Sequence, residues 1–101
     1  MSWTKVCRLS ELADESAIGV EVGTQKVCVA RSNGTVYAVR DECSHAEIAL
    51  SDGEVDEGTV ECWLHGSRFD LSTGMPSGLP ANRPIPTYPV KVEGDDVLVS
   101  L

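Results

Sequence analysis

The sequence lacks the features that mark several common classes of protein. No apolar stretch approaches the roughly 20 residues that a helix needs to cross a bilayer. Residues 1–13 carry polar or charged side chains every few positions and no apolar segment typical of secretory signals, so a cytoplasmic protein is expected. Internal repeats are absent, and only residues 10–14 suggest a single helical turn. The chain is therefore predicted to be neither a membrane protein nor a helical one.

Positive charge is scarce as well. The 101 residues include 8 Lys and Arg against 16 Asp and Glu, so the formal net charge is −8. Nucleic acids and anionic membranes are normally bound by basic surfaces, and both are therefore disfavoured as partners. A partner protein with a basic patch fits this charge.

The acidic residues are unevenly distributed along the chain. Eight of the sixteen lie between positions 41 and 61, where there is no Lys or Arg. This segment is interpreted either as a solvated face that keeps the protein soluble or as a docking face that steers a basic partner. The eight residues are Asp41, Glu42, Glu47, Asp52, Glu54, Asp56, Glu57 and Glu61.

Short strands account for most of the predicted structure. Asn33-Gly34 separates two apolar runs and is a strong signal for a two-residue hairpin, because both residues tolerate positive φ. Residues 93–96 are predicted to form a second hairpin near the C-terminus. The pattern favours an all-β fold, an antiparallel β-sandwich or small barrel. The predicted strands are 4–9, 18–22, 26–31, 35–40, 59–62, 67–71, 88–93 and 97–101.

The middle of the chain differs from its two ends. Residues 41–86 are rich in loop signals and contain four of the five prolines. A chain of this length has room for one domain. We therefore predict a single domain over 1–101, in which a β-scaffold (about 1–40 and 87–101) carries an inserted loop-rich subdomain (about 41–86).

Both histidines of the chain lie beside a cysteine within this subdomain. Cys43 and His45 are two positions apart, Cys62 and His65 are three apart, and 16 residues separate the pairs. Such a set predicts a four-ligand metal site, either a structural zinc site or a Rieske iron–sulfur centre, and spacing alone does not decide between them. No helical pattern follows Cys62, whereas a zinc finger places its histidines on a helix.

No catalytic constellation accompanies these ligands. With both histidines bound to metal, no imidazole is left to act as a general base or to activate a nucleophile. Four protein ligands also leave the metal without an open position for a substrate. The site is therefore predicted to have a structural or electron-transfer role.

The residues around the ligands resemble a known family. Cys-x-His, a gap of about 16, then Cys-x-x-His-Gly is the signature of Rieske [2Fe–2S] proteins, and residues 66–74 (GSRFDLSTG) continue the match. Leu50 and Gly53 stand where the family has an apolar residue and a turn glycine. Residues 76–86 are similar to the proline-containing loop that covers the cluster, and 88–92 to the strand returning to the base. The likeness covers nearly the whole chain, and it is greatest to the ferredoxin components of bacterial aromatic-ring dioxygenases.

This resemblance implies a function and a set of partners. It implies one Rieske-type [2Fe–2S] cluster bound by Cys43, His45, Cys62 and His65, in an inserted cluster-binding subdomain on a Rieske-like β-scaffold. The protein would be a monomer that carries single electrons from a flavin-dependent reductase to a terminal oxygenase through transient electrostatic docking, without catalysing a reaction itself. The alternatives are a Rieske carrier for iron–sulfur assembly or nitrite-type reduction, a redox sensor, or a zinc-stabilised interaction module.

The ligand set and its surroundings bear on the reduction potential. Neutral imidazoles in place of two thiolates leave the oxidised cluster without net charge, which makes it easier to reduce. High-potential members carry an extra cysteine in each ligand loop, joined as a disulfide, but here Ala46 and Leu64 stand in these loops. We therefore predict a potential at the low end of the range from about −150 to +300 mV. Cys7 and Cys28 lie in apolar strands and are predicted to be buried core thiols.

Three further residues are expected beside the cluster: Trp63, Gly66 and Ser67. Ser67 is either the source of a hydroxyl hydrogen bond to a cluster sulfur or an ordinary strand serine. Trp63 stands where the family usually has proline, so its ring is expected either to pack against the covering loop or to lie exposed as a partner contact.

Overall fold

The computed structural model describes residues 3–42, 49–63, 66–77 and 83–101. This part of the chain contains antiparallel strands and two short 3₁₀ helices, η1 (Leu9–Glu11) and η2 (Leu50–Asp52), and none of its helices is long and apolar enough to span a membrane. The all-β prediction is confirmed. The strands are β1 (Trp3–Arg8), β2 (Ser16–Val22), β3 (Gln25–Ser32), β4 (Thr35–Arg40), β5 (Val55–Asp56), β6 (Thr59–Glu61), β7 (Arg68–Asp70), β8 (Thr87–Tyr88), β9 (Val90–Glu93) and β10 (Asp96–Ser100).

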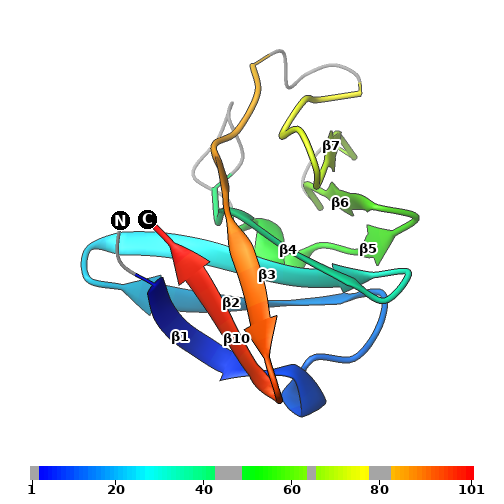
Figure 1. Cartoon of the computed structure of the whole chain (residues 1–101). Coiled ribbons are helices and arrows are strands. Elements are labelled where there is room, and N and C mark those ends of the chain that lie inside the picture. Colours follow the sequence, from blue (N-terminus) through cyan, green and yellow to red (C-terminus); the bar gives the residue numbers. More distant parts are fainter. Residues whose placement is uncertain (1–2, 43–48, 64–65, 78–82) are drawn as a thin grey trace.

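The strands form three sheets in three layers (Figure 1). The middle sheet has the order β2-β3-β4-β8, and its two faces are covered by the sheets β1-β10-β9 and β5-β6-β7. Strand β3 is buried on both sides: Val27 and Val29 point to one face, and Cys28 and Ala30 to the other. A continuous apolar run is what a strand buried on both faces requires.

Each face of the middle sheet has its own apolar core. We call the core toward β1-β10-β9 the scaffold core, and the core toward β5-β6-β7 the subdomain core. The buried residues of the scaffold core are Leu12, Val27, Val29, Ala38, Val97 and Val99. Those of the subdomain core are Cys28, Ala30, Val39, Leu50, Val55, Val60, Cys62, Phe69, Leu71 and Ile85.

Both predicted hairpins are present. Asn33 and Gly34 have φ of 51° and 79°, and they join β3 to β4 as a two-residue turn. Gly94, with φ of 62°, begins the turn between β9 and β10. Two further hairpins were not predicted: residues 23–24, with Gly23 at φ of 62°, join β2 to β3, and Glu57 and Gly58, with φ of 47° and 76°, join β5 to β6.

The predicted strand 88–93 is wrong in one respect, because it is divided at Pro89. Strand β8 pairs with β4 in the middle sheet, whereas β9 pairs with β10 in an outer sheet. Proline has no N–H to donate, so it suits the point where a chain leaves one sheet for another. The Pro89 carbonyl still accepts a hydrogen bond from Ser100 N, at 3.0 Å.

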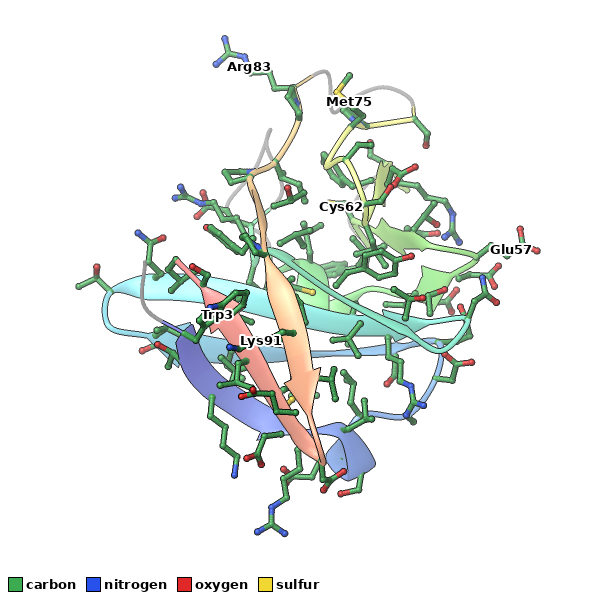
Figure 2. All side chains as sticks on the ribbon, viewed as in Figure 1. Trp3, Glu57, Cys62, Met75, Arg83 and Lys91 are labelled. Carbon is green, nitrogen blue, oxygen red and sulfur yellow. The ribbon has the colours of Figure 1, made fainter. Side chains whose placement is uncertain are left out.

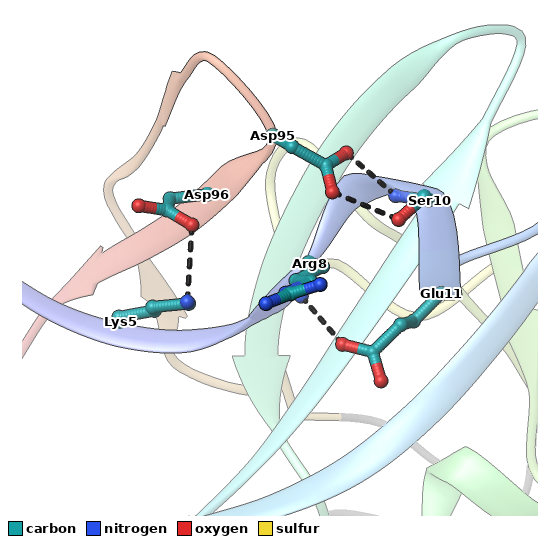
Figure 3. A network of polar contacts seen from close by, with 6 residues as sticks. All are labelled: Lys5, Arg8, Ser10, Glu11, Asp95 and Asp96. Atoms are coloured by element: carbon teal, nitrogen blue, oxygen red, sulfur yellow. Dashed lines mark hydrogen bonds and ion pairs between the residues drawn. The ribbon is translucent and has the colours of Figure 1, made fainter.

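Polar contacts hold the end of the scaffold at the β9–β10 turn (Figure 3). The carboxylate of Asp95 accepts hydrogen bonds from Ser10 N at 3.0 Å and Ser10 Oγ at 2.8 Å. Lys5 forms an ion pair with Asp96 at 3.1 Å. Helix η1 is thereby tied to the C-terminal hairpin, and β1 to β10.

Candidate metal centre

One of the four predicted ligands, Cys62, lies in the described part of the chain. Cys62 directly follows β6, and its side chain is fully buried in the subdomain core. Cys43, His45 and His65 lie outside the described residues. Among the described residues, no three His, Cys, Asp or Glu side chains gather as a metal site. The four-ligand set therefore stays a prediction.

Two backbone hydrogen bonds join Cys62 to residues 66 and 67. Cys62 N donates to the carbonyl of Ser67 at 2.7 Å, and Gly66 N donates to the carbonyl of Cys62 at 2.9 Å. Gly66 has φ of 76°, a conformation that favours glycine. The glycine of the sequence motif thus brings residues 66 and 67 back against the predicted ligand Cys62.

The other two residues expected beside the cluster differ in exposure. Ser67 is buried and directly precedes β7. Its bond to a cluster sulfur stays a prediction. Trp63 is 53% exposed although its neighbour Cys62 is fully buried. Of the two alternatives for Trp63, this exposure favours a surface position available to a partner.

The loop with the first pair of ligands is closed at its base by a carboxylate. Asp41, directly after β4, is buried and donates its N–H to Lys26 O at 3.0 Å. Its Oδ1 accepts a hydrogen bond from Ser51 N at 2.7 Å, and its Oδ2 accepts one from Ser51 Oγ at 2.7 Å. We call this pair the Asp41–Ser51 clasp. Residues 42–50, which include Cys43 and His45, leave and return between its two members.

The segment that resembles the covering loop is fixed at both ends. Ser77 N donates to Arg68 O at 2.8 Å, and Ile85 N donates to Gly74 O at 2.9 Å. A Cβ atom on Gly74 would lie 2.0 Å from the carbonyl oxygen of Ile85, so only glycine fits there. Pro86 O accepts from Arg40 N at 3.0 Å. Residues 78–82, between these anchors, lie outside the described part of the chain.

Leu50 and Gly53, the two further positions of the family resemblance, have different structural roles. Leu50 is fully buried in the subdomain core, as an apolar family position requires. Gly53 is not a positive-φ turn residue, since its φ is −91°. A Cβ atom there would lie 1.7 Å from the carbonyl oxygen of Glu61, so the glycine permits a close approach of two backbones.

The two remaining cysteines are poor metal ligands. Burial, followed by the negative charge of Asp41, raises the pKa of Cys28 far above its ordinary value, so its thiol stays protonated. Burial also raises the pKa of Cys7, with smaller contributions from Glu11 and Asp95. The prediction of a buried thiol is confirmed for Cys28. Cys7 is only partly buried and packs against the scaffold core.

The acidic segment contains both engaged and free carboxylates. Beside the buried Asp41, Glu42 pairs with Arg40 at 3.4 Å and Glu61 pairs with Arg68 at 3.1 Å. Glu47 lies outside the described residues. The others are exposed and make no ion pair within the described part of the chain, and Figure 2 shows Glu57 projecting at one side. We call these four the acidic edge: Asp52, Glu54, Asp56 and Glu57.

Comparison with known proteins decides the family. The family model described as the Rieske [2Fe-2S] domain matches residues 2–89. The chain belongs to the Rieske [2Fe–2S] family. Its cofactor is accordingly one Rieske-type [2Fe–2S] cluster, and this sets the zinc alternative aside. The described residues fit such a cluster: Cys62 is held against Gly66 and Ser67 by two backbone hydrogen bonds, and the raised pKa of Cys28 makes this thiol a poor competitor as a ligand.

Rieske ferredoxins are similar to this chain over its whole length. It is 43% identical over 101 residues to the ferredoxin component of biphenyl 2,3-dioxygenase from Rhodococcus jostii (strain RHA1), covering all of this chain and 94% of the relative. It is 36% identical over 96 residues to the 3-phenylpropionate/cinnamic acid dioxygenase ferredoxin subunit of Escherichia coli (strain K12), covering 94% and 90%.

Solved structures agree with this comparison. The ferredoxin of carbazole 1,9a-dioxygenase from Nocardioides aromaticivorans IC177 superposes with a TM-score of 0.91 at 36% identity, over 99% of this chain and 98% of that one. A complex of reduced oxygenase and oxidized ferredoxin in carbazole 1,9a-dioxygenase contains a chain with a TM-score of 0.91 at 34% identity, over 97% of this chain and 92% of that one. The structural comparison and the sequence comparison therefore agree on the Rieske fold.

Proposed function

We propose that this Rieske protein carries single electrons, in the cytoplasm, from a flavin-dependent reductase to the terminal oxygenase of an aromatic-ring dioxygenase system. The observation that carries the proposal is the full-length similarity to ferredoxin components of such systems, at 43% identity. A similar ferredoxin at 34% identity has been solved in complex with its oxygenase. Both argue for a carrier that meets a separate enzyme.

The bound cluster supplies one-electron oxidation and reduction. Four residues of the chain would hold it: Cys62 and His65, which lie in the sequence segment whose residues 62, 66 and 67 are joined by backbone hydrogen bonds, and Cys43 and His45, which lie in sequence between the two members of the Asp41–Ser51 clasp. With four protein ligands the cluster has no position for a substrate. The protein therefore passes electrons, and chemistry on the aromatic substrate belongs to the oxygenase.

Two surfaces suit transient partners. The acidic edge offers exposed carboxylates that would attract a basic reductase or oxygenase surface. Trp63 offers a large exposed ring one residue from a predicted ligand, where a partner must approach closely to receive the electron. The first surface would raise the association rate, and the second would lengthen the life of the complex.

Reconstitution tests the proposal. The purified holoprotein is mixed anaerobically with NADH and the flavin-dependent reductase of an aromatic-ring dioxygenase system, and reduction of the cluster is followed by absorption. The terminal oxygenase of the same system is then added with its aromatic substrate and oxygen. We expect reoxidation of the cluster coupled to product formation, and neither in a Cys62→Ser variant. Failure of the reduced protein to deliver electrons to the oxygenase, with efficient delivery to a nitrite-type reductase, would overturn the proposal.

A further inference from the structure

The Asp41–Ser51 clasp is a built polar contact at the base of the first ligand loop. Asp41 accepts hydrogen bonds from both the backbone N–H and the hydroxyl of Ser51, each at 2.7 Å. Bonds of this length between a carboxylate and its donors belong to the stronger class in proteins. They fix Asp41 and Ser51, which stand on either side of residues 42–50 in the sequence, relative to each other.

Strand β2 also leaves room for the clasp. A Cβ atom on Gly19, in β2, would lie 2.7 Å from Asp41 Oδ2 and 2.7 Å from Ser51 Oγ. Glycine at this position therefore leaves room for both side chains against the middle sheet. Asp41 is only 8% exposed, so its contacts are largely shielded from water.

The negative charge of Asp41 acts on the neighbouring core. Together with burial it raises the pKa of the Cys28 thiol. Cys28 shares the subdomain core with the predicted ligand Cys62, so the charge acts on the core to which the cluster is attached. Charges that are shielded from solvent act over longer distances than exposed ones.

We infer that Asp41 and Ser51 are positioning residues for the cluster: their clasp fixes the two points from which the segment with Cys43 and His45 starts and ends, and the carboxylate charge of Asp41 lowers the reduction potential. The geometric part follows from the two short bonds between these flanking residues. The electrostatic part follows because a nearby negative charge disfavours the addition of an electron.

Two kinds of variant separate these parts. Asp41→Asn removes the charge, but the amide oxygen can still accept from Ser51 N and the amide nitrogen can donate to Ser51 Oγ. Ser51→Ala keeps the charge and removes one of the two bonds. Gly19→Ala disturbs the clasp from another strand without changing the loop. Glu42→Gln is the matched control, because Glu42 is nearer in sequence to Cys43 but pairs with Arg40 at the surface, where its carboxylate is 38% exposed.

Each holoprotein is examined by redox titration, by the EPR g-values of its reduced cluster and by its iron content. We expect Asp41→Asn to raise the midpoint potential by more than Glu42→Gln does, with g-values close to those of the wild type. We expect Ser51→Ala and Gly19→Ala to shift the g-values and to retain less iron. Circular dichroism shows whether each variant remains folded.

Two results would overturn the inference. The charge effect is refuted if the potential of Asp41→Asn rises no further than that of Glu42→Gln. The positioning role is refuted if Ser51→Ala and Gly19→Ala keep wild-type g-values and iron content. The inference depends on the bound cluster, and no assay uses a reductase or oxygenase. A failed reconstitution would therefore count against the proposed function and leave this inference standing.

Discussion

The carboxylate of Glu15 accepts a hydrogen bond from the hydroxyl of the buried Ser32, whose oxygen lies 2.8 and 3.0 Å from the two carboxylate oxygens. The same carboxylate accepts from Asn33 N at 3.0 Å and Glu57 N at 3.1 Å. Ser32 Oγ in turn accepts from Gly58 N at 2.8 Å. Glu15 therefore ties the β3–β4 turn to the β5–β6 turn, which lies in the segment predicted to bind the cluster.

Replacing Glu15 by alanine is expected to lower the free energy of unfolding by about 1–3 kcal/mol, because the hydroxyl of Ser32 and two backbone N–H groups lose their acceptor. Glu15→Gln keeps one carbonyl oxygen and is expected to cost less. Urea unfolding of the holoproteins measures both. Glu21→Ala, which removes an exposed carboxylate from β2, is the matched control and should stay within about 0.5 kcal/mol of the wild type. A loss in Glu15→Ala no larger than in this control would contradict the role of Glu15.

Replacing Trp63 by alanine is expected to weaken binding to the terminal oxygenase about tenfold or more, because exposed tryptophans at the centre of an interface often contribute more than 1.4 kcal/mol. The measurement is the ferredoxin concentration that half-saturates the coupled assay, with the reduction potential checked separately. Trp3→Ala is the control: Trp3 is 40% exposed, and Figure 2 shows it with Lys91 on the scaffold, away from Met75 and Arg83. Equal effects of the two substitutions would mean that Trp63 is not a docking contact.

Neutralising the acidic edge is expected to slow association with a partner and to flatten its dependence on ionic strength. Glu54→Gln combined with Glu57→Gln removes two exposed carboxylates that form no ion pair among the described residues. Stopped-flow reduction by the reductase and reoxidation by the oxygenase, each measured from about 0.01 to 0.15 M salt, check this over the range in which screening changes most. Glu21→Gln combined with Glu93→Gln makes the same change of charge on the scaffold. Identical salt dependence in both double variants and the wild type would leave the edge with a role in solubility alone.

Stability is expected to fall as the pH rises above about 9. The pKa of Cys28 is raised in the folded state, whereas in the unfolded chain the thiol titrates near its ordinary value of 9.0. Above that pH the unfolded state releases a proton that the native state retains, so the free energy of unfolding decreases. Urea unfolding at pH 7.5 and pH 10 should show a larger decrease for the wild type than for Cys28→Ala. Cys7→Ala is the control, since Cys7 is less buried, and it should retain most of the decrease.

The strands could be predicted where the sequence has a clear run of strand-forming residues that ends at a recognisable turn. Strands β3 and β4 lie within a residue of their predicted bounds because a β-branched run and Asn33-Gly34 define them. Strand β5 has only two residues, Val55 and Asp56, and so short a segment has no periodicity to detect. The division at Pro89 depends on which sheet each half of the strand joins, and tertiary contacts rather than the local sequence determine this.

The ligand residues of the site could be predicted from the sequence, whereas the residues that support the ligand segments were less predictable. The spacing of cysteine and histidine indicates a four-ligand site because those side chains are rare and clustered. Asp41, by contrast, belongs in sequence to a run of acids and was expected on a solvated or docking face. Its contact with Ser51 arises only when the chain returns after ten residues. Its position immediately before the ligand loop was the one available signal.

The pairing of β1 with β10 has a consequence for biosynthesis. In their sheet, β1 bonds to β10 alone, and Trp3 is opposite Ser100. Strand β1 therefore cannot join its sheet until β10, about 90 residues later in the chain, has been synthesised. All four predicted iron ligands are translated in that interval, before the scaffold core can be completed by Val97 and Val99. The segments that carry the predicted ligands are thus complete before the sheet that covers the scaffold core can form.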